Sequence, residues 1–419
     1  MEFKIEQYKL KNGIRVVEIP MKGVESSLAM VMVRTGSRNE TDEQLGISHV
    51  LEHMLFKGTE KYPTPQVLAG VVDAMGAEFN AFTSKEYTAY YIRSSSENLG
   101  KALEVLGEMV VKPRLDEMAL EREKGVIIEE INMYEDKPME RAEEEFENLM
   151  FAGSNLGRLI IGSRETVRGV TAVDLRKYKE EWYRGENVVV MVGGDLGQFK
   201  TQNSKGKTIA QSSKLVEESF GELEEGKLRG FVDEVRYGEE REKVIEKGTE
   251  QTHFVIGVPG LAIDDERRYV EAVLRVVLGG NMSSRLFTEI REKRGLAYYV
   301  GATVEHFYDG GYFGVRAGVR KDKFEEAVKV VKEQMRLVSQ DLKEEEVEKA
   351  KSYLRGKMAL SLEGVNGVLR WFGKGLILKG EVEQPREWLK RVGEVSLEEV
   401  KELAREMLKE EEMRLVVVE

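Results

Sequence analysis

The chain has 419 residues, too many for one ordinary hydrophobic core, so two or more domains are expected. Hydrophobic residues make up 41% and charged residues 33%, and the formal net charge of -12 argues against the basic surface of a nucleic-acid-binding protein. Cysteine is absent, which excludes disulfides, thiolate nucleophiles and cysteine-based zinc sites, so any metal must be held by histidine and carboxylate.

The N-terminus shows no apolar segment behind a basic start, and no run of about eighteen uncharged apolar residues follows it. We therefore expect a cytoplasmic protein with neither nucleic acid nor membrane as a partner.

The first half of the chain interleaves short strand patterns with longer helical ones. Residues 8–20 alternate around the Asn12-Gly13 pair, which predicts a hairpin. The hydrophobic spacing then predicts a strand at 26–36, helices at 46–58 and 64–76, paired strands at 78–84 and 86–94, helices at 97–110 and 115–134, and a strand at 187–197.

A change of composition follows this first group of elements. Residues 200–214 are polar and lack a periodic apolar face, so we interpret them as a loop or a disordered excursion. Residues 215–223 still indicate a short helix of the first domain. We accordingly expect domains at 1–225 and 226–419.

The pattern recurs about 220 residues later, which indicates an internal repeat. The strand at 250–260, the helix at 267–280, the paired strands within 296–319 and the helices at 323–335 and 342–358 repeat the earlier order. The expected fold class is α+β, with two homologous domains, each a mostly antiparallel sheet covered by helices.

The two copies differ in one informative place. His49 and His53 of the first copy correspond to Tyr269 and Val273 of the second, and Glu52 corresponds to Ala272. The polar cluster is therefore not needed to build the fold, which favours a function for it over packing.

On a helix, positions i and i+4 share one face, so His49 and His53 can direct ring nitrogens at one point, with Glu52 on the same face. Two imidazoles at this spacing suit Zn²⁺, which needs a third protein ligand. The plain alternative is that the histidines are satisfied core residues.

The helix at 115–134 offers three candidates for that third ligand. Glu123 and Glu130 are seven residues apart and lie about 20° apart around the helix axis, whereas Glu129 is turned away by roughly 100°. One of the aligned pair could bind the metal while the other holds a ligand in place, and spacing alone does not choose between them.

The segment "HVLEH" is the inverted zinc-protease signature, and the chain resembles peptidase family M16, in the branch of the processing peptidases. The resemblance covers essentially the whole chain, including "EREKGVIIEEINMYEDKP" and "FAGSNLGRLIIG". It implies an M16 peptidase-like (LuxS-MPP-like) fold, with a zinc-binding catalytic first domain and a second domain that lacks metal ligands.

The resemblance assigns roles to individual residues. It implies Zn²⁺ as cofactor with His49, His53 and Glu130 as ligands, Glu52 as general base, and Glu123 as the residue that supports a ligand. The strands at 78–94 would add the substrate as a further strand, with Asn80 and Ala81 at the positions that hydrogen-bond the peptide.

The second copy would contribute Arg291 and Tyr298, which match residues that anchor the peptide and stabilise the oxyanion in the family. One chain resembles half of the larger enzymes, which implies a homodimer or a heterodimer with a paralogue, Arg291 and Tyr298 then acting on the partner's zinc. His253 and His306 match no ligand position, and we interpret both as structural.

The resulting prediction is a zinc-dependent metalloendopeptidase that hydrolyses peptides or presequence-like segments in an enclosed chamber. The alternative is a non-catalytic assembly or peptide-binding subunit of the same family.

Overall fold

The computed structural model describes residues 1–197, 200–202 and 208–419, and it divides into two compact units. Unit 1 consists of Met1–Ile131, Leu159–Val232 and Leu360–Gln384, and unit 2 consists of Asn132–Arg158, Asp233–Ala359 and Pro385–Glu419. Both units are thus discontinuous in sequence. The division at 225/226 stays a prediction for the limits of the two homologous domains.

Unit 1 is built on a six-stranded sheet with the strand order β1-β2-β6-β3-β5-β4. Its strands are β1 (Glu6–Lys9), β2 (Arg15–Pro20), β3 (Ser26–Val33), β4 (Glu78–Thr83), β5 (Thr88–Ser95) and β6 (Val188–Gly194). The predicted hairpin is confirmed, because β1 and β2 pair antiparallel and Gly13 adopts the left-handed φ of +93° that its turn requires.

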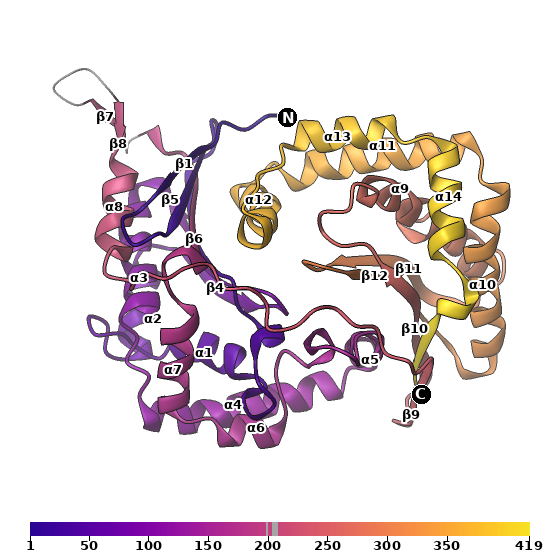
Figure 1. Ribbon diagram of the computed structural model, residues 1–419, viewed down its shortest axis with the longest axis horizontal. Helices are drawn as coiled ribbons and strands as arrows, with labels where there is room; N and C mark the ends of the chain where they lie inside the picture. Colours follow the sequence, from indigo (N-terminus) through magenta and orange to yellow (C-terminus); the bar gives the residue numbers. More distant parts are fainter. Residues whose placement is uncertain (198–199, 203–207) are drawn as a thin grey trace. The chain divides into compact units, whose positions relative to one another are not determined.

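Helices cover both faces of this sheet. They are α1 (Ile47–Leu55), α2 (Pro65–Ala74), α3 (Leu99–Val111), α4 (Glu117–Glu135), α6 (Arg164–Gly169), α7 (Ala172–Trp182), α8 (Gln211–Phe220) and α12 (Val365–Lys379). Within unit 1, α3 and α12 lie on opposite faces of the sheet (Figure 1). Gly373 of α12 packs against Met32 of β3, so this late helix completes the core of the first unit.

Unit 2 contains a five-stranded sheet with the order β11-β12-β10-β13-β9. Its strands are β9 (Glu242–Ile245), β10 (Gln251–Gly260), β11 (Ala297–His306), β12 (Gly311–Arg320) and β13 (Arg414–Val418). Its helices are α5 (Pro138–Met150), α9 (Arg268–Gly279), a π-helix (Phe287–Glu292), α10 (Phe324–Asp341), α11 (Glu344–Ser361), α13 (Pro385–Glu394) and α14 (Leu397–Met407).

The two sheets confirm the predicted duplication. In unit 1 the strands β2 and β6 form the parallel pair, and β9 and β13 form it in unit 2, while the other neighbours in both sheets are antiparallel. Strand β10 then corresponds to β3, and β11 to β4. The fold class, two α+β units with mostly antiparallel sheets, is as predicted.

The interpretation of residues 200–214 as a loop is wrong in part. Lys200–Gln202 and Thr208–Ala210 pair as the strands β7 and β8, and α8 begins at Gln211, while residues 203–207 lie outside the described part of the chain. The helix predicted at 215–223 is present as the C-terminal part of α8. No helix of the described residues has both the length and the apolar character that a membrane crossing requires.

The start of α1 is fixed by a glycine that no other residue could easily replace. Gly46 has a φ of +88°, and a Cβ at this position would lie 2.6 Å from the Ile161 carbonyl oxygen. The amides of Gly46 and Ser48 donate to the buried carboxylate of Glu40 at 2.7 and 2.9 Å, which satisfies donors that a helix start leaves free. These contacts set the direction in which α1 carries its histidines.

We expect Gly46→Ala to destabilise the protein, because it combines a left-handed backbone with a steric conflict. Strain of this kind costs about 1–3 kcal/mol, measurable as a loss of unfolding free energy in urea followed by circular dichroism. Gly70→Ala is the matched control, since Gly70 lies on α2 with no atom near its Cβ position and alanine has the higher helix propensity. Equal stability of the two variants would contradict the role given to Gly46.

Candidate metal centre

Helices α1 and α4 bring two histidines and a carboxylate together. The ligand atoms of His49, His53 and Glu130 all lie within 4.8 Å of one another. Among the described residues, this is the one group of at least three His, Asp or Glu side chains that could hold a metal ion. Glu130 Oε2 is 3.8 Å from His49 Nε2 and 3.4 Å from His53 Nε2. Glu129, the residue before Glu130 on α4, is exposed, as the spacing predicted.

These separations fit a shared ion better than direct hydrogen bonds. Three ligand atoms placed tetrahedrally at about 2.0–2.1 Å from Zn²⁺ would be separated by roughly 3.4 Å, close to the two distances to Glu130. The buried Nδ1 of His49 has no hydrogen-bond partner in the part of the chain that the structure describes, so hydrogen bonding does not explain why this ring is buried here. The three residues therefore fit a divalent metal.

Glu123 holds His53 from the side opposite the candidate ion. His53 Nδ1 and Glu123 Oε1 are 2.8 Å apart, so the ring N–H donates to the carboxylate and Nε2 is left for the metal. Glu123 Oε2 in turn accepts an ion pair from Lys57 at 2.7 Å. Lys57 was not predicted from the sequence, because it lies just past the end of α1 at Leu55, four residues beyond His53.

The pKa values of the two histidines are shifted in opposite directions. Burial and the neighbouring His53 lower the pKa of His49 to about 4, against a smaller opposing effect of Glu130 and Glu123. Burial also lowers the pKa of His53, but the hydrogen bond with Glu123 and the negative charges of Glu123 and Glu130 outweigh it and raise this pKa to about 9. Without a metal, the protonated His53 thus supplies the positive charge that holds the carboxylates together.

Glu52 lies beside this group and is not one of its members. Burial raises the pKa of its carboxyl, and the hydrogen bond that its Oε2 accepts from Thr83 Oγ1 at 2.5 Å opposes this rise. Thr83 is the last residue of β4, so the edge strand of the sheet orients the carboxylate. Thr83 was not predicted from the sequence either, because it is 31 residues away from Glu52 in the chain.

Strand β4 is an edge of the unit 1 sheet, paired to β5 on one side. The backbone amide of Ala81 donates to Asn80 Oδ1 at 2.8 Å, so the Asn80 side chain covers an amide of the strand. The two residues that the sequence placed at the peptide-binding edge therefore do lie on a sheet edge.

Arg291 and Tyr298 belong to unit 2. Arg291 is exposed near the end of the π-helix, with its guanidinium 4.9 Å from the centre of the Phe287 ring. Tyr298 is the extra residue of a β-bulge in β11, between Ala297 and Tyr299, and it is 78% exposed. Bulges re-aim side chains in this way, and both residues can contact a ligand.

The remaining histidines each have one polar partner in unit 2. His253 Nδ1 lies 2.9 Å from the Tyr299 hydroxyl, and His306 Nε2 lies 2.5 Å from Glu271 Oε2. Neither belongs to a group of potential ligands among the described residues.

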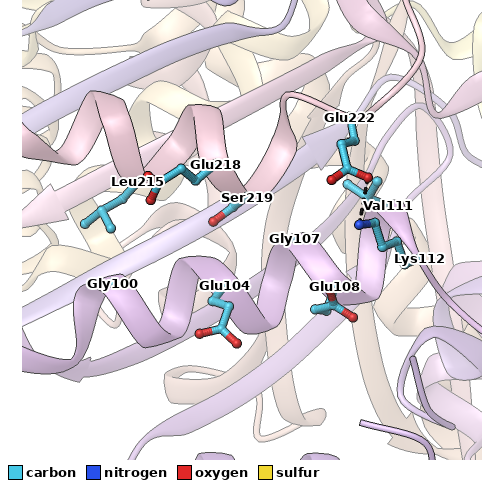
Figure 2. A pocket seen from close by; sticks show the side chains of 10 residues that line it. All are labelled: Gly100, Glu104, Gly107, Glu108, Val111, Lys112, Leu215, Glu218, Ser219 and Glu222. Carbon is cyan, nitrogen blue, oxygen red and sulfur yellow. Dashed lines mark ion pairs between the residues drawn. The ribbon is translucent and has the colours of Figure 1, made fainter. Parts of the chain in front are cut away.

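A groove between α3 and α8 carries several acidic residues (Figure 2). Glu222 at one end pairs with Lys112 at 2.7 Å, and Glu104 pairs with Lys101 at 3.2 Å. The helices touch at Gly107, where a Cβ would lie 2.5 Å from the Ser219 carbonyl oxygen. The groove is a tight seam between helices, and we assign no ligand to it.

Comparisons with known proteins agree with this geometry. The model of the insulinase family (peptidase family M16) matches residues 15–164, and that of the peptidase M16 inactive domain matches residues 169–354. Two relatives are named uncharacterized zinc proteases. The one from Streptomyces coelicolor is 35% identical over 96% of this chain and 87% of its own length, and the one from Bacillus subtilis is 35% identical over 97% and 96%.

Solved structures share the fold over the whole chain. A protease from Helicobacter pylori has a TM-score of 0.90 and 24% identity, with 100% of both chains covered. A structure titled peptidase M16 inactive domain, from Pseudomonas fluorescens, has a TM-score of 0.90 and 19% identity, with 99% of this chain and 97% of the other covered. Together with the two family models and the two bacterial relatives, these likenesses show that the chain belongs to peptidase family M16.

Proposed function

We propose that this protein is a zinc-dependent metalloendopeptidase that hydrolyses peptides or presequence-like segments within an enclosed chamber. The observation that carries the proposal is the convergence of His49, His53 and Glu130 from two helices, with a fourth side chain, Glu52, beside them and outside the ligand group. Membership of family M16 and the names of the bacterial relatives support zinc as the metal.

In this proposal, zinc held by His49, His53 and Glu130 would act as a Lewis acid toward the scissile carbonyl and acidify the attacking water. Glu52 is the general base: its Oε1 takes a proton from the water while Thr83 holds Oε2. The same carboxyl then gives this proton to the leaving amine, so the peptide bond ends as a carboxylate and an amine without an acyl-enzyme.

The edge of β4 is the proposed binding place of the substrate backbone. An extended peptide can add to a sheet edge by main-chain hydrogen bonds, which makes binding tolerant of sequence. Asn80 Oδ1 accepts a hydrogen bond from the Ala81 amide, and in the complex a carbonyl oxygen of the peptide would accept this hydrogen bond instead. The Asn80 side chain would thus protect the edge from unwanted pairing when no peptide is bound.

Glu52→Gln should bind zinc as the wild type does and lose peptide cleavage by at least about a hundredfold, because glutamine cannot accept the proton. Metal content and chelator-sensitive cleavage of a quenched peptide measure the two properties. Glu129→Gln is the control, since Glu129 is exposed on α4, and it should retain both. Undiminished turnover by Glu52→Gln would refute the assignment of the base, and a zinc-loaded wild type that binds peptides without cutting them would favour the non-catalytic alternative.

Lys57→Met should weaken zinc binding about tenfold, because residues that orient a metal ligand typically contribute 10–100-fold to affinity. Without the ammonium group, Glu123 loses the ion pair that fixes it against His53. Zinc affinity is measured by competition with a fluorescent chelator.

Lys57→Arg should restore most of the affinity lost in Lys57→Met, and Lys61→Met, which removes an exposed lysine beside Glu104, should leave it unchanged. Wild-type affinity in Lys57→Met would show that Glu123 needs no support.

We also propose that the active form is a dimer in which Arg291 and Tyr298 act on the partner's zinc site, where they anchor the peptide and stabilise the oxyanion. Both are exposed in unit 2. Mixing Glu52→Gln protein with Arg291→Ala/Tyr298→Phe protein should then restore cleavage that neither variant shows alone, since mixed dimers contain one complete site. A mixture as inactive as its components would show that both residues act within their own chain.

A further inference from the structure

Arg370 of α12 lies above the substrate edge of the sheet. The centre of its guanidinium is 5.4 Å from the Phe82 ring of β4 and 5.9 Å from the Tyr91 ring of β5. Its Nε donates to Asn366 Oδ1 at 3.1 Å, one helical turn earlier. The side chain is thus held by two rings and an amide, and its two terminal nitrogens donate no hydrogen bond to any described residue.

The register of the sheet places Arg370 and Glu52 on opposite faces. Phe82 pairs with Ala89, and the next residue, Thr83, points to the other face, where it contacts Glu52. Strand β4 therefore separates two environments: the metal cluster on one side, and Arg370 with Phe82 on the other.

The charge of Arg370 faces two aromatic rings but no carboxylate among the described residues. Arg370 is exposed and forms no ion pair with a carboxylate in the described parts of the chain. Arg93 of β5 lies on the same face as Phe82, because it pairs with Glu78, which is four residues before Phe82 on β4. Unlike Arg370, it forms a salt bridge, with Glu78 at 3.1 Å. The two arginines differ in this respect, which makes Arg93 a matched comparison.

A peptide strand beside β4 would run about 4.8 Å from it and direct alternate side chains to the two faces. A side chain opposite Phe82 would start about 5 Å from the Phe82 Cβ, within the reach of a glutamate to the guanidinium. Arginine binds carboxylates through two parallel hydrogen bonds. The net charge of -12 favours basic peptides at long range, so a preference for a carboxylate here would need such a specific contact.

We propose that Arg370, with Phe82 beneath it, forms a subsite that prefers an acidic side chain in the bound peptide, on the face of the sheet opposite the metal cluster. This inference rests on the proposed function, because it requires the peptide to lie along β4. It names one specificity-determining residue and the chemical class that it selects.

The proposal is tested with quenched peptides that carry a single Glu, placed in turn at each position around the cleavage site. Each peptide is compared with one that has Gln at the same position. We expect one position at which Glu raises kcat/KM about threefold to fivefold, the range of an exposed ion pair, and no such effect at the two neighbouring positions, which face the metal cluster. Arg370→Gln should abolish the preference, Arg370→Glu should transfer it to Lys, and Arg93→Gln should leave it intact. A Glu preference that survives Arg370→Gln, or none at any position, would overturn the subsite.

A binding measurement separates this inference from the proposed function. Fluorescence anisotropy with Glu52→Gln protein reports the affinities of the same peptides without cleavage. If Glu peptides bind more tightly than Gln peptides only when Arg370 is present, the subsite holds even for a protein that cuts nothing. If the wild type cleaves peptides and Arg370→Gln alters neither binding nor cleavage of the Glu peptides, the hydrolase stands and the subsite falls.

Discussion

The site depends first on the hydrogen bond between His53 Nδ1 and Glu123 Oε1. This bond fixes the ring so that Nε2 faces Glu130, and it does so from α4, the same helix that supplies Glu130. One helix thus provides both the carboxylate of the candidate ligand group and the carboxylate that orients the imidazole. The spacing of seven residues makes this possible, because the two side chains lie nearly above one another.

Three carboxylates, those of Glu52, Glu123 and Glu130, surround the two imidazoles and would repel one another without nearby positive charge. His53 lies between Glu123 and Glu130 and keeps the pKa of both carboxyls below the usual value for glutamic acid, and Lys57 adds to this effect on Glu123 alone. A divalent cation could take over part of this role from the His53 proton, since a metal ligand must be a neutral imidazole. Three ionised carboxylates with Lys57 and a protonated His53 leave a net charge of -1, whereas a divalent ion with two neutral imidazoles brings the sum to 0. The cation therefore completes the charge balance of the cluster.

Sequence spacing predicted the parts of the site that lie on one helix face and missed those brought in by the sheet. His49, His53 and Glu52 follow from helical periodicity, and the choice of Glu130 over Glu123 came from the family resemblance, because both share one face of α4. Lys57 lies beyond the end of α1, where periodicity no longer applies. Thr83 reaches Glu52 from the edge strand β4, and Arg370 reaches Phe82 through the return of α12; no local pattern encodes either contact. The same long-range return explains why Leu360–Gln384 belongs to unit 1 although it follows most of unit 2.

The duplicated fold explains why the polar cluster is best understood as functional. In unit 2 the positions of His49 and His53 are occupied by Tyr269 and Val273, which are 5% and 0% exposed and belong to the hydrophobic core. The same helix position can thus be filled by apolar packing, which is favourable at roughly 25 cal/mol per Å² buried. Unit 1 instead carries His49 and Glu52 at 9% exposure each, and burying such groups costs free energy unless they are paired. The fold is built twice, but only unit 1 carries the free-energy cost of burying these polar groups. This difference indicates that they serve a function in unit 1.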